Sequence, residues 1–177
     1  MASVALDDAA ARSTSHDALT ALFRAEYPRL VRMAALLLGD EGAAEEVVQD
    51  AFVKLHTGWR RVRDAEKAPA WLRTAVLNGA RSHLRHRHVR RRLDQPAPLS
   101  TPSAEGGALA GEEHRRVVAA LRTLPARQRE ALVLKFYLDL SEAETAAAMG
   151  VSAGSVKTHV HRGLATLQTT LGREEER

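Results

Sequence analysis

The chain has 177 residues, a formal net charge of +4 and no cysteine. The lack of cysteine excludes disulfides, cysteine-ligated zinc or iron–sulfur sites and thiol catalysis, and it favours an intracellular protein. The longest apolar run, Met33–Leu38, is far shorter than the roughly 20 residues that cross a bilayer, so we expect no membrane-spanning segment and a cytoplasmic location.

Apolar residues recur at three- and four-residue spacing through most of the chain, which is typical of helices. Residues 1–16 lack this period and are expected to form a flexible leader. Asp17 is expected to cap the first helix, and Gly39 is placed to end it. A second helix is predicted over Glu41–His56, with its apolar positions turned inward and its acidic positions turned to solvent.

A polar loop, Val62–Ala68, precedes a third helix that is predicted to begin at Pro69 and to end near Arg92. The next stretch is rich in Pro, Gly and small residues and is predicted to be a linker. Helical periodicity then resumes near Glu112, and Pro125 is expected to open a further helix that contains Phe136. No strand alternation is found, so we predict an all-α protein with two small helical domains joined by a flexible linker. The predicted division is leader 1–16, first domain 17–93, linker 94–111, second domain 112–171 and tail 172–177.

The strongest local pattern is that of a helix-turn-helix over Ser141–Leu167. Ser141 and Glu144 have the spacing of a capping box at the start of a short helix. Gly150 is suited to the left-handed position that ends this helix, and Ser152 to the cap of the next one. Two helices joined by so short a turn cross at a steep angle, as in DNA-binding helix-turn-helix motifs.

The second helix of this motif has an apolar stripe and a polar face. The stripe is predicted to face the core and consists of Val156, Val160, Leu164, Leu167 and Leu171. The opposite face carries Lys157, Thr158, His161 and Arg162, whose polar groups suit base edges and phosphates. This face is therefore a candidate DNA-reading surface. The alternative is a solvated amphipathic helix that binds nothing.

The first domain carries opposite charges on two helices. Five acids and no basic residue lie between Asp40 and Asp50, whereas Arg81–Arg92 contains six Arg, three His and no acid. The basic run can neutralise phosphates, with an affinity that falls as salt rises. Trp71 and Asn78 could stack on and hydrogen-bond an unpaired base, although the periodicity is equally compatible with a buried Trp71.

Metal binding and catalysis receive little support from the sequence. His83, His86 and His88 lie close in sequence, but the last two do not share a helix face and the surrounding arginines would repel a cation. No phosphate-binding loop, zinc-protease motif or nucleophile elbow occurs. We therefore expect no cofactor, no metal and no enzymatic activity, with a His-dependent metalloenzyme as a remote alternative.

Three segments together resemble the extracytoplasmic-function (ECF) group of bacterial RNA polymerase sigma factors, which have only sigma regions 2 and 4. The segments are AEEVVQDAFVKLHTGW, APAWLRTAVLNGARSHLR and GVSAGSVKTHVHRGLATL. They resemble, in order, the helix that binds the polymerase clamp, the part that opens the −10 element and the helix that reads the −35 element. The resemblance covers about Leu19–Leu171. It implies core RNA polymerase and promoter DNA as partners, and usually an anti-sigma factor.

The resemblance also implies roles for individual residues. Those that would contact the clamp are Glu46, Gln49 and Asp50. For −10 binding the positions are Trp71, Asn78, Arg81 and Arg85. Asn78 would line a pocket for an extruded base, and the loop Val62–Ala68 would form the other wall of that pocket. Arg81 and Arg85 would contact the DNA backbone. For −35 binding the positions are Ser155, Lys157, Thr158, His161 and Arg162. Lys157 stands where the family commonly has Arg, so it cannot make the bidentate contact to guanine.

A second hypothesis comes from the segment SVKTHVHR, which also resembles the recognition helix of LuxR-type activators. A stand-alone regulator of that type would need neither the acidic helix nor the −10 segment. Binding to core polymerase that depends on Asp50 would separate the two hypotheses.

Overall fold

The computed structural model describes the backbone of residues 2–59, 65–92 and 112–175, and the side chains of residues 17–59, 65–90 and 115–172. The described residues form helices and no strand, which confirms the predicted all-α class. The predicted linker, the last residues of the predicted tail and residues 62–64 of the loop Val62–Ala68 lie outside the described residues.

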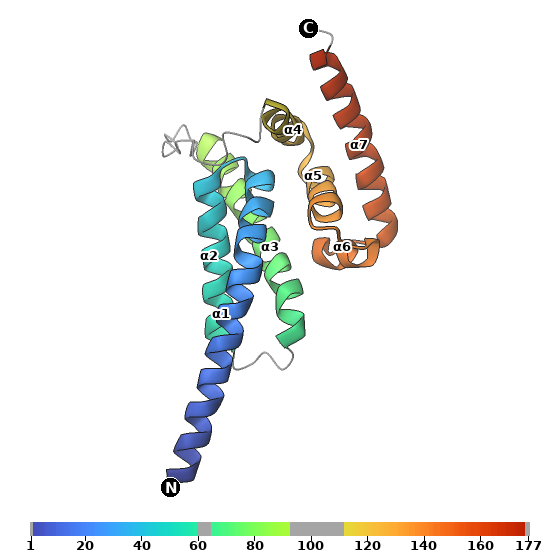
Figure 1. The fold of residues 1–177 in the computed structure, drawn as a ribbon. Coiled ribbons are helices and arrows are strands. Elements are labelled where there is room, and N and C mark those ends of the chain that lie inside the picture. The colour runs from blue at the N-terminus through green and yellow to red at the C-terminus, as the bar shows by residue number, and fades with distance from the viewer. Residues whose placement is uncertain (1, 60–64, 93–111, 176–177) are drawn as a thin grey trace.

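Three long helices form the first unit (Figure 1). They are α1 (Ala2–Leu38), α2 (Glu41–Gly58) and α3 (Ala68–Arg92), and a 3₁₀ turn at Ala65–Lys67 leads into α3. Their inward faces supply the largest fully buried side chains of this unit, such as Leu30, Met33, Leu72 and Leu77. The helices thus bury one apolar stripe each, as their periodicity predicts.

The start of α1 differs from the sequence prediction. The helix begins at Ala2, so Asp17 lies inside it, and the expected cap at Asp17 is wrong. The segment before Asp17 is rich in Ala, which has the highest intrinsic helix propensity, and this allows the helix to extend without an apolar stripe. The other end agrees with the prediction, because Gly39 has φ of 67° and accordingly ends α1.

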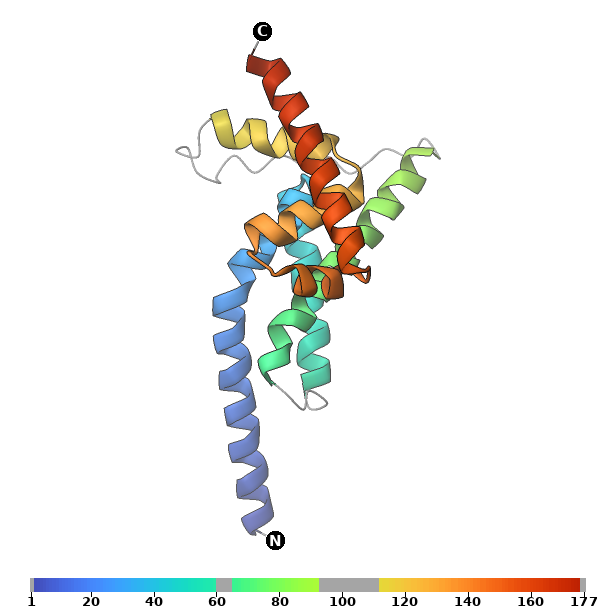
Figure 2. The ribbon, with the colours of Figure 1, turned by 90° about the vertical axis from the view of Figure 1, so that its right-hand side faces the viewer.

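The second unit combines several short helices with one long helix, α7 (Figure 2). In chain order they are α4 (Glu112–Thr123), α5 (Ala126–Leu132), the π-helix η3 (Val133–Tyr137), α6 (Glu142–Met149) and α7 (Ala153–Glu175). Pro125 precedes the first turn of α5, as expected. The long α7 packs across α5 and α6 and carries the C-terminal end of the chain away from the first unit (Figures 1 and 2).

The helix that follows Pro125 changes its winding after Leu132. Wider turns replace the α pattern there, with bonds from Leu138 N–H to the Val133 carbonyl (3.2 Å) and from Leu140 N–H to the Leu134 carbonyl (3.2 Å). The expected apolar position Phe136 is consequently exposed, with 60% of its surface accessible.

The two units are in contact rather than separate. One continuous cluster of buried residues runs from the first unit through Leu134, Leu138 and Met149 to Val156 of α7. The sequence predicts two helical domains joined by a linker, and in the structure α1 and α3 in addition pack directly on the helices of the second unit. The chain therefore adopts a closed arrangement in which both units share apolar burial.

Candidate nucleic-acid interface

The helix-turn-helix has the predicted caps. The Ser141 hydroxyl accepts a bond from Glu144 N–H (3.2 Å), and the Glu144 carboxylate accepts one from Ser141 N–H (2.9 Å). The Ser141 hydroxyl also donates to the Glu144 carboxylate (2.6 Å), and this bond, followed by the one from Ser141 N–H, holds the pKa of the Glu144 carboxyl below its ordinary value. Gly150 has φ of 68° and ends α6, which confirms the prediction for this turn.

The start and inner face of α7 fix the direction of the reading helix. The Ser152 hydroxyl accepts a bond from Ser155 N–H (3.2 Å), so Ser152 caps this helix as predicted. Val156 is 1% exposed and faces the core. Gly163 brings the backbone of α7 against Leu132 of α5, because a Cβ at Gly163 would lie 2.9 Å from Leu132 Cδ1. The predicted stripe is nevertheless incomplete, since Leu164 is 39% exposed.

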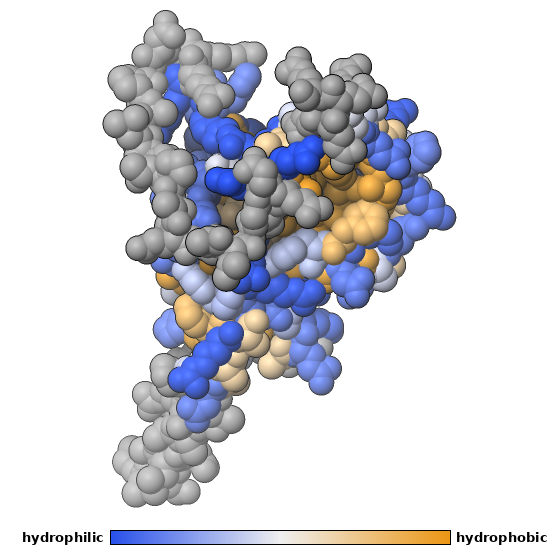
Figure 3. Space-filling view, turned by 45° about the horizontal axis from the view of Figure 1, so that its top comes forward, coloured by the Kyte–Doolittle hydropathy of each residue, from blue (hydrophilic) through white to orange (hydrophobic). Residues whose placement is uncertain are grey.

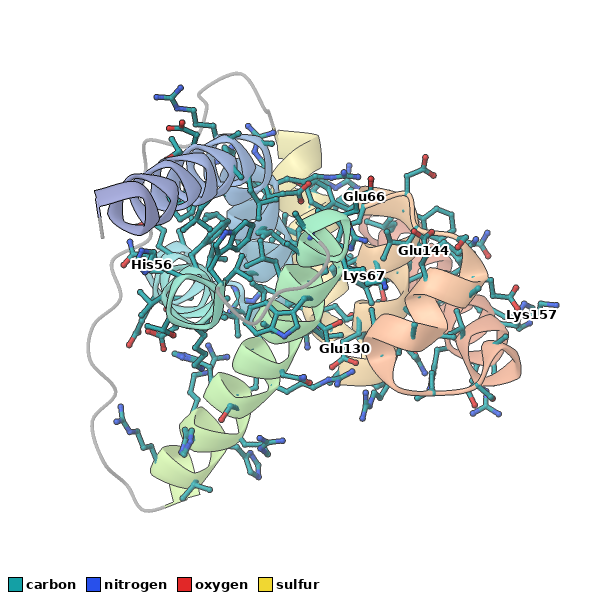
Figure 4. The ribbon with its side chains drawn as sticks, turned by 90° about the horizontal axis from the view of Figure 1, so that it is seen from below. His56, Glu66, Lys67, Glu130, Glu144 and Lys157 are labelled. Atoms are coloured by element: carbon teal, nitrogen blue, oxygen red, sulfur yellow. The ribbon has the colours of Figure 1, made fainter. Side chains whose placement is uncertain are left out.

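The opposite face of α7 is open to solvent. Lys157, Thr158, His161 and Arg162 are all exposed, while Ser155 is half-buried. Lys157 Nζ lies 3.7 Å from the Glu142 carboxylate of α6, and Figure 4 shows Lys157 pointing away from the helices of the first unit. A surface pair of this kind contributes little and leaves the ammonium available to a phosphate.

The candidate −10 residues all lie on α3, but their side chains differ in exposure to solvent. Trp71 is 44% exposed, so it is not the buried core residue that periodicity also allowed. Asn78 and Arg85 are exposed as well. Arg81 is only partly exposed, because its guanidinium donates to the Asn78 side-chain oxygen (3.1 Å) and to the carboxylate of Glu130 in α5 (2.7 and 2.8 Å).

The acidic helix α2 presents its predicted contact residues to solvent. Glu46, Gln49 and Asp50 are exposed on one side of α2, whose other side is buried. An aromatic cluster supports this helix against α1, with Phe23 and Phe52 in edge-to-face contact at a centroid distance of 5.0 Å. Asp40 caps the start of this helix, because its carboxylate accepts a bond from Ala43 N–H (3.0 Å); the sequence patterns did not identify this cap.

Metal-binding geometry is not found in the part of the chain that the structure describes. Among these residues no group of three His, Cys, Asp or Glu side chains could hold a metal ion. His83, His86 and His88 all lie on α3, where the sequence placed them.

The sequence reading also missed the polar residues that join the two units. Glu130 is 4% exposed and was not singled out, although it binds Arg81. Arg129 of α5 donates to the Leu37 carbonyl of α1 (2.7 Å), and burial, followed by the charge of Arg122, lowers its pKa. Burial raises the pKa of Tyr137, whose hydroxyl donates to the Arg29 carbonyl (3.4 Å). Such pairs join distant parts of the sequence and leave no local pattern.

The second unit exposes a helix-turn-helix face, and the first unit carries a basic, partly aromatic helix (α3) and an exposed acidic helix (α2). Together these features define a two-domain DNA-binding protein. The family models agree: Sigma-70 region 2 matches residues 22–90 and Sigma-70 region 4 matches residues 114–167. The chain belongs to the ECF group of RNA polymerase sigma factors. We refer below to α1–α3 as region 2 and to α4–α7 as region 4.

Several relatives support this assignment over most of their length. The chain is 32% identical to the RNA polymerase sigma-E factor of Streptomyces coelicolor over 151 residues, which cover 84% of this chain and 82% of that relative. It is 33% identical to the ECF RNA polymerase sigma factor SigM of Mycobacterium tuberculosis, covering 85% and 76% of the two chains.

Solved structures show the same fold. The sigma factor RpoE of Bartonella quintana, in complex with the anti-sigma factor NepR, superposes with a TM-score of 0.75 at 25% identity, covering 86% of this chain and 96% of that one. CnrH in complex with the cytosolic domain of CnrY superposes with a TM-score of 0.66 at 25% identity, covering 92% and 97%.

These findings agree with the sigma-factor hypothesis, in which the protein directs RNA polymerase to promoters in transcription initiation. They give no support to the stand-alone regulator of LuxR type. Within the described ranges, no helix is both long enough and apolar enough to pass through a bilayer.

Proposed function

We propose that this protein binds core RNA polymerase through α2, reads the −35 element with α7 and holds the opened −10 element on α3. The observation that carries this proposal is that each of the three candidate surfaces has exposed residues, on a chain whose two regions match the family. A sigma factor needs contacts of these three kinds, whereas a stand-alone regulator needs only the duplex-reading helix.

The reading of duplex DNA falls to α7. Its exposed residues Lys157, Thr158, His161 and Arg162 would enter the major groove, with Ser155 near the helix start positioned toward the DNA backbone. Arg162 can contact a guanine with two hydrogen bonds, whereas Lys157 can supply only a point charge. We therefore expect the −35 preference to depend more on Arg162 than on Lys157.

Promoter opening falls to α3. Trp71 exposes an aromatic surface on which an unpaired base can stack, and Asn78 can hydrogen-bond the edge of a base. Extruding a base costs a few kcal/mol, and this contact must offset that cost. Arg81 and Arg85 would hold the DNA backbone beside it.

Polymerase binding falls to the exposed acids of α2. Glu46 and Asp50 present carboxylates, and Gln49 an amide, to a basic surface of the clamp. Tethering both regions to the enzyme makes the second DNA contact intramolecular, which raises its effective concentration. The protein supplies no catalytic group in this scheme and acts as a subunit, in the cytoplasm where the polymerase works.

A protein partner that blocks these surfaces also fits the family. The two solved relatives described above are bound to an anti-sigma factor or to the cytosolic domain of CnrY. Apolar side chains reach the surface of region 4 here, including Phe136 (60% exposed) and Val117 (40% exposed), and Figure 3 shows a hydrophobic area on that side of the molecule bordered by hydrophilic residues. We propose that an anti-sigma factor covers apolar surface of this kind.

Retention on immobilised core polymerase tests the α2 assignment. The full chain should be retained, and Asp50→Lys should lose retention because it reverses a charge in the contact. Asp17→Asn is a matched control, since it removes an exposed acid of α1 that we assign to no contact. Equal retention of Asp50→Lys and the full chain would contradict the proposal.

A further inference from the structure

The contact between the two regions is built around one ion pair. Arg81 of α3 donates from Nε to Glu130 Oε1 (2.8 Å) and from Nη2 to Glu130 Oε2 (2.7 Å), in the two-pronged geometry that is the strongest form of this pair. Its Nη2 also donates to the Met149 carbonyl of region 4 (3.2 Å). The side chains of Arg81 and Glu130 are 19% and 6% exposed, so solvent screens the pair only weakly.

Other contacts reinforce this closure. Arg129 of region 4 donates to the Leu37 carbonyl at the end of α1, and Arg29 of α1 donates to the Leu138 carbonyl of region 4. Beside the Arg81–Glu130 pair, Leu77 and Leu84 of α3 line a narrow cavity together with residues of α5. In Figure 4 Glu130 lies between α3 and the helices of region 4.

The closed arrangement uses the same guanidinium that we assign to promoter DNA. A guanidinium that already makes two hydrogen bonds to a carboxylate cannot make two more to a phosphate in the same way. The negative charge of Glu130 beside it would also repel a phosphate. Arg81 also donates a hydrogen bond to the side-chain oxygen of Asn78 (3.1 Å). The same network therefore includes the residue that we assign to binding the extruded base. A promoter complex that sets the regions one and a half duplex turns apart, about 50 Å, would separate Arg81 from Glu130.

We propose that region 4 inhibits region 2 within the free protein: Glu130 occupies Arg81, and the regions must separate before α3 can hold single-stranded promoter DNA. The inference rests on the proposed function of α3. It adds a conformational equilibrium in which polymerase or DNA binds the open form. The apparent affinity for single-stranded DNA is then reduced by the small fraction of molecules that are open.

Fluorescence energy transfer measures the opening directly. The chain has no natural cysteine, so dye pairs can be attached at Ala25→Cys in α1 and Ala165→Cys in α7, both exposed and assigned to no contact. Glu130→Gln keeps the shape of the side chain and removes its charge. We expect it to raise the ratio of open to closed molecules on the order of 10-fold, because bonds to a charged partner become neutral ones.

Two variants serve as controls for this measurement. Arg127→Gln removes the partner of Glu130 that lies within region 4 (3.1 Å) and should leave the energy transfer close to that of the parent protein. Asp17→Asn removes one negative charge far from the contact in sequence, and so measures the effect of net charge alone.

Binding of a fluorescent, mixed-sequence single-stranded 20-mer at fixed salt tests the masking of Arg81. Glu130→Gln should tighten binding by about the factor found for opening, whereas Asp17→Asn should change it much less. The charge exchange Arg81→Glu with Glu130→Arg should restore the closed energy transfer yet bind the 20-mer weakly. Circular dichroism melting confirms that each variant is folded.

The possible failures are distinguishable. Unchanged energy transfer in Glu130→Gln, or an exchanged pair that stays open, would overturn the inhibitory contact and leave the proposed function intact. Opening without tighter binding would show that Arg81 is not masked from DNA. Absence of promoter-directed transcription by the parent protein with core polymerase would instead refute the proposed function.

Discussion

The approach of α7 to α5 at Gly163 determines how the reading helix is held. A Cβ at this position would lie 2.9 Å from Leu132 Cδ1, 3.2 Å from Leu132 Cγ and 3.4 Å from Gln128 Cβ. Gly163→Ala therefore adds a methyl group to a filled contact, which typically costs about 1–3 kcal/mol. The substitution also gains up to about 1 kcal/mol of helix propensity.

A matched substitution separates these two effects. Gly172 lies on the same helix, and a Cβ there would meet no atom within 4 Å. Gly172→Ala should therefore stabilise the protein by at most about 1 kcal/mol, whereas Gly163→Ala should be less stable than this control by about 1–3 kcal/mol. Denaturation in urea, with the slope m checked for constancy, measures both values.

The same pair of variants links packing to DNA binding. Arg162 lies next to Gly163 in the sequence. A shift of α7 that relieves the contact in Gly163→Ala would therefore also move the reading face, and we expect this variant to bind duplex DNA more weakly. Gly172→Ala should leave duplex binding unchanged. Equal stability and equal DNA affinity of the two variants would refute the view that the close approach of α7 and α5 orients the reading face.

Three further predictions concern single side chains. Arg162→Ala should weaken binding to a promoter duplex by about 1–3 kcal/mol in a fluorescence anisotropy titration, and an unchanged affinity and sequence profile would exclude Arg162 from the reading face. Asn78→Ala should reduce run-off transcription from double-stranded promoters more than from pre-melted ones; equal losses would argue against a role in opening. The capping box should give stability a dependence on acid pH. The pKa of Glu144 is lowered in the folded protein, so its contribution is complete above the ordinary value of 4.5 and is lost as pH falls through the lowered value. Urea unfolding across this range should show that dependence in the parent protein, and an equal dependence in Glu144→Gln would contradict the assignment.

Local features of this fold could be predicted from the sequence because their causes lie within a few residues. The capping box of Ser141 and Glu144 and the left-handed Gly150 follow from spacing and from backbone sterics alone. The exposure of the reading face likewise follows from helical periodicity once one stripe is buried. The start of α1 could not be placed in the same way, because Asp17 is as acceptable inside a helix as at its cap when the preceding residues are themselves good helix formers.

Features that depend on tertiary contact were not predictable from these patterns. Arg81 and Glu130 are 49 positions apart, and an arginine in a basic run gives no sign that one of its carboxylate partners lies in another domain. Trp71 has helical spacing that suits either the core or the surface, and only packing decides between them. The closed arrangement of the two regions arises from such contacts, so it became evident only in three dimensions.

Promoter-directed transcription is the most direct test of the central claim. Run-off transcription with purified core polymerase and this protein, on a library of genomic templates, should yield discrete transcripts that core polymerase alone does not produce. Their start sites should share two short sequence elements at a constant spacing, one for each region. Transcripts identical to those of core polymerase alone would contradict the assignment of this chain as an initiation subunit.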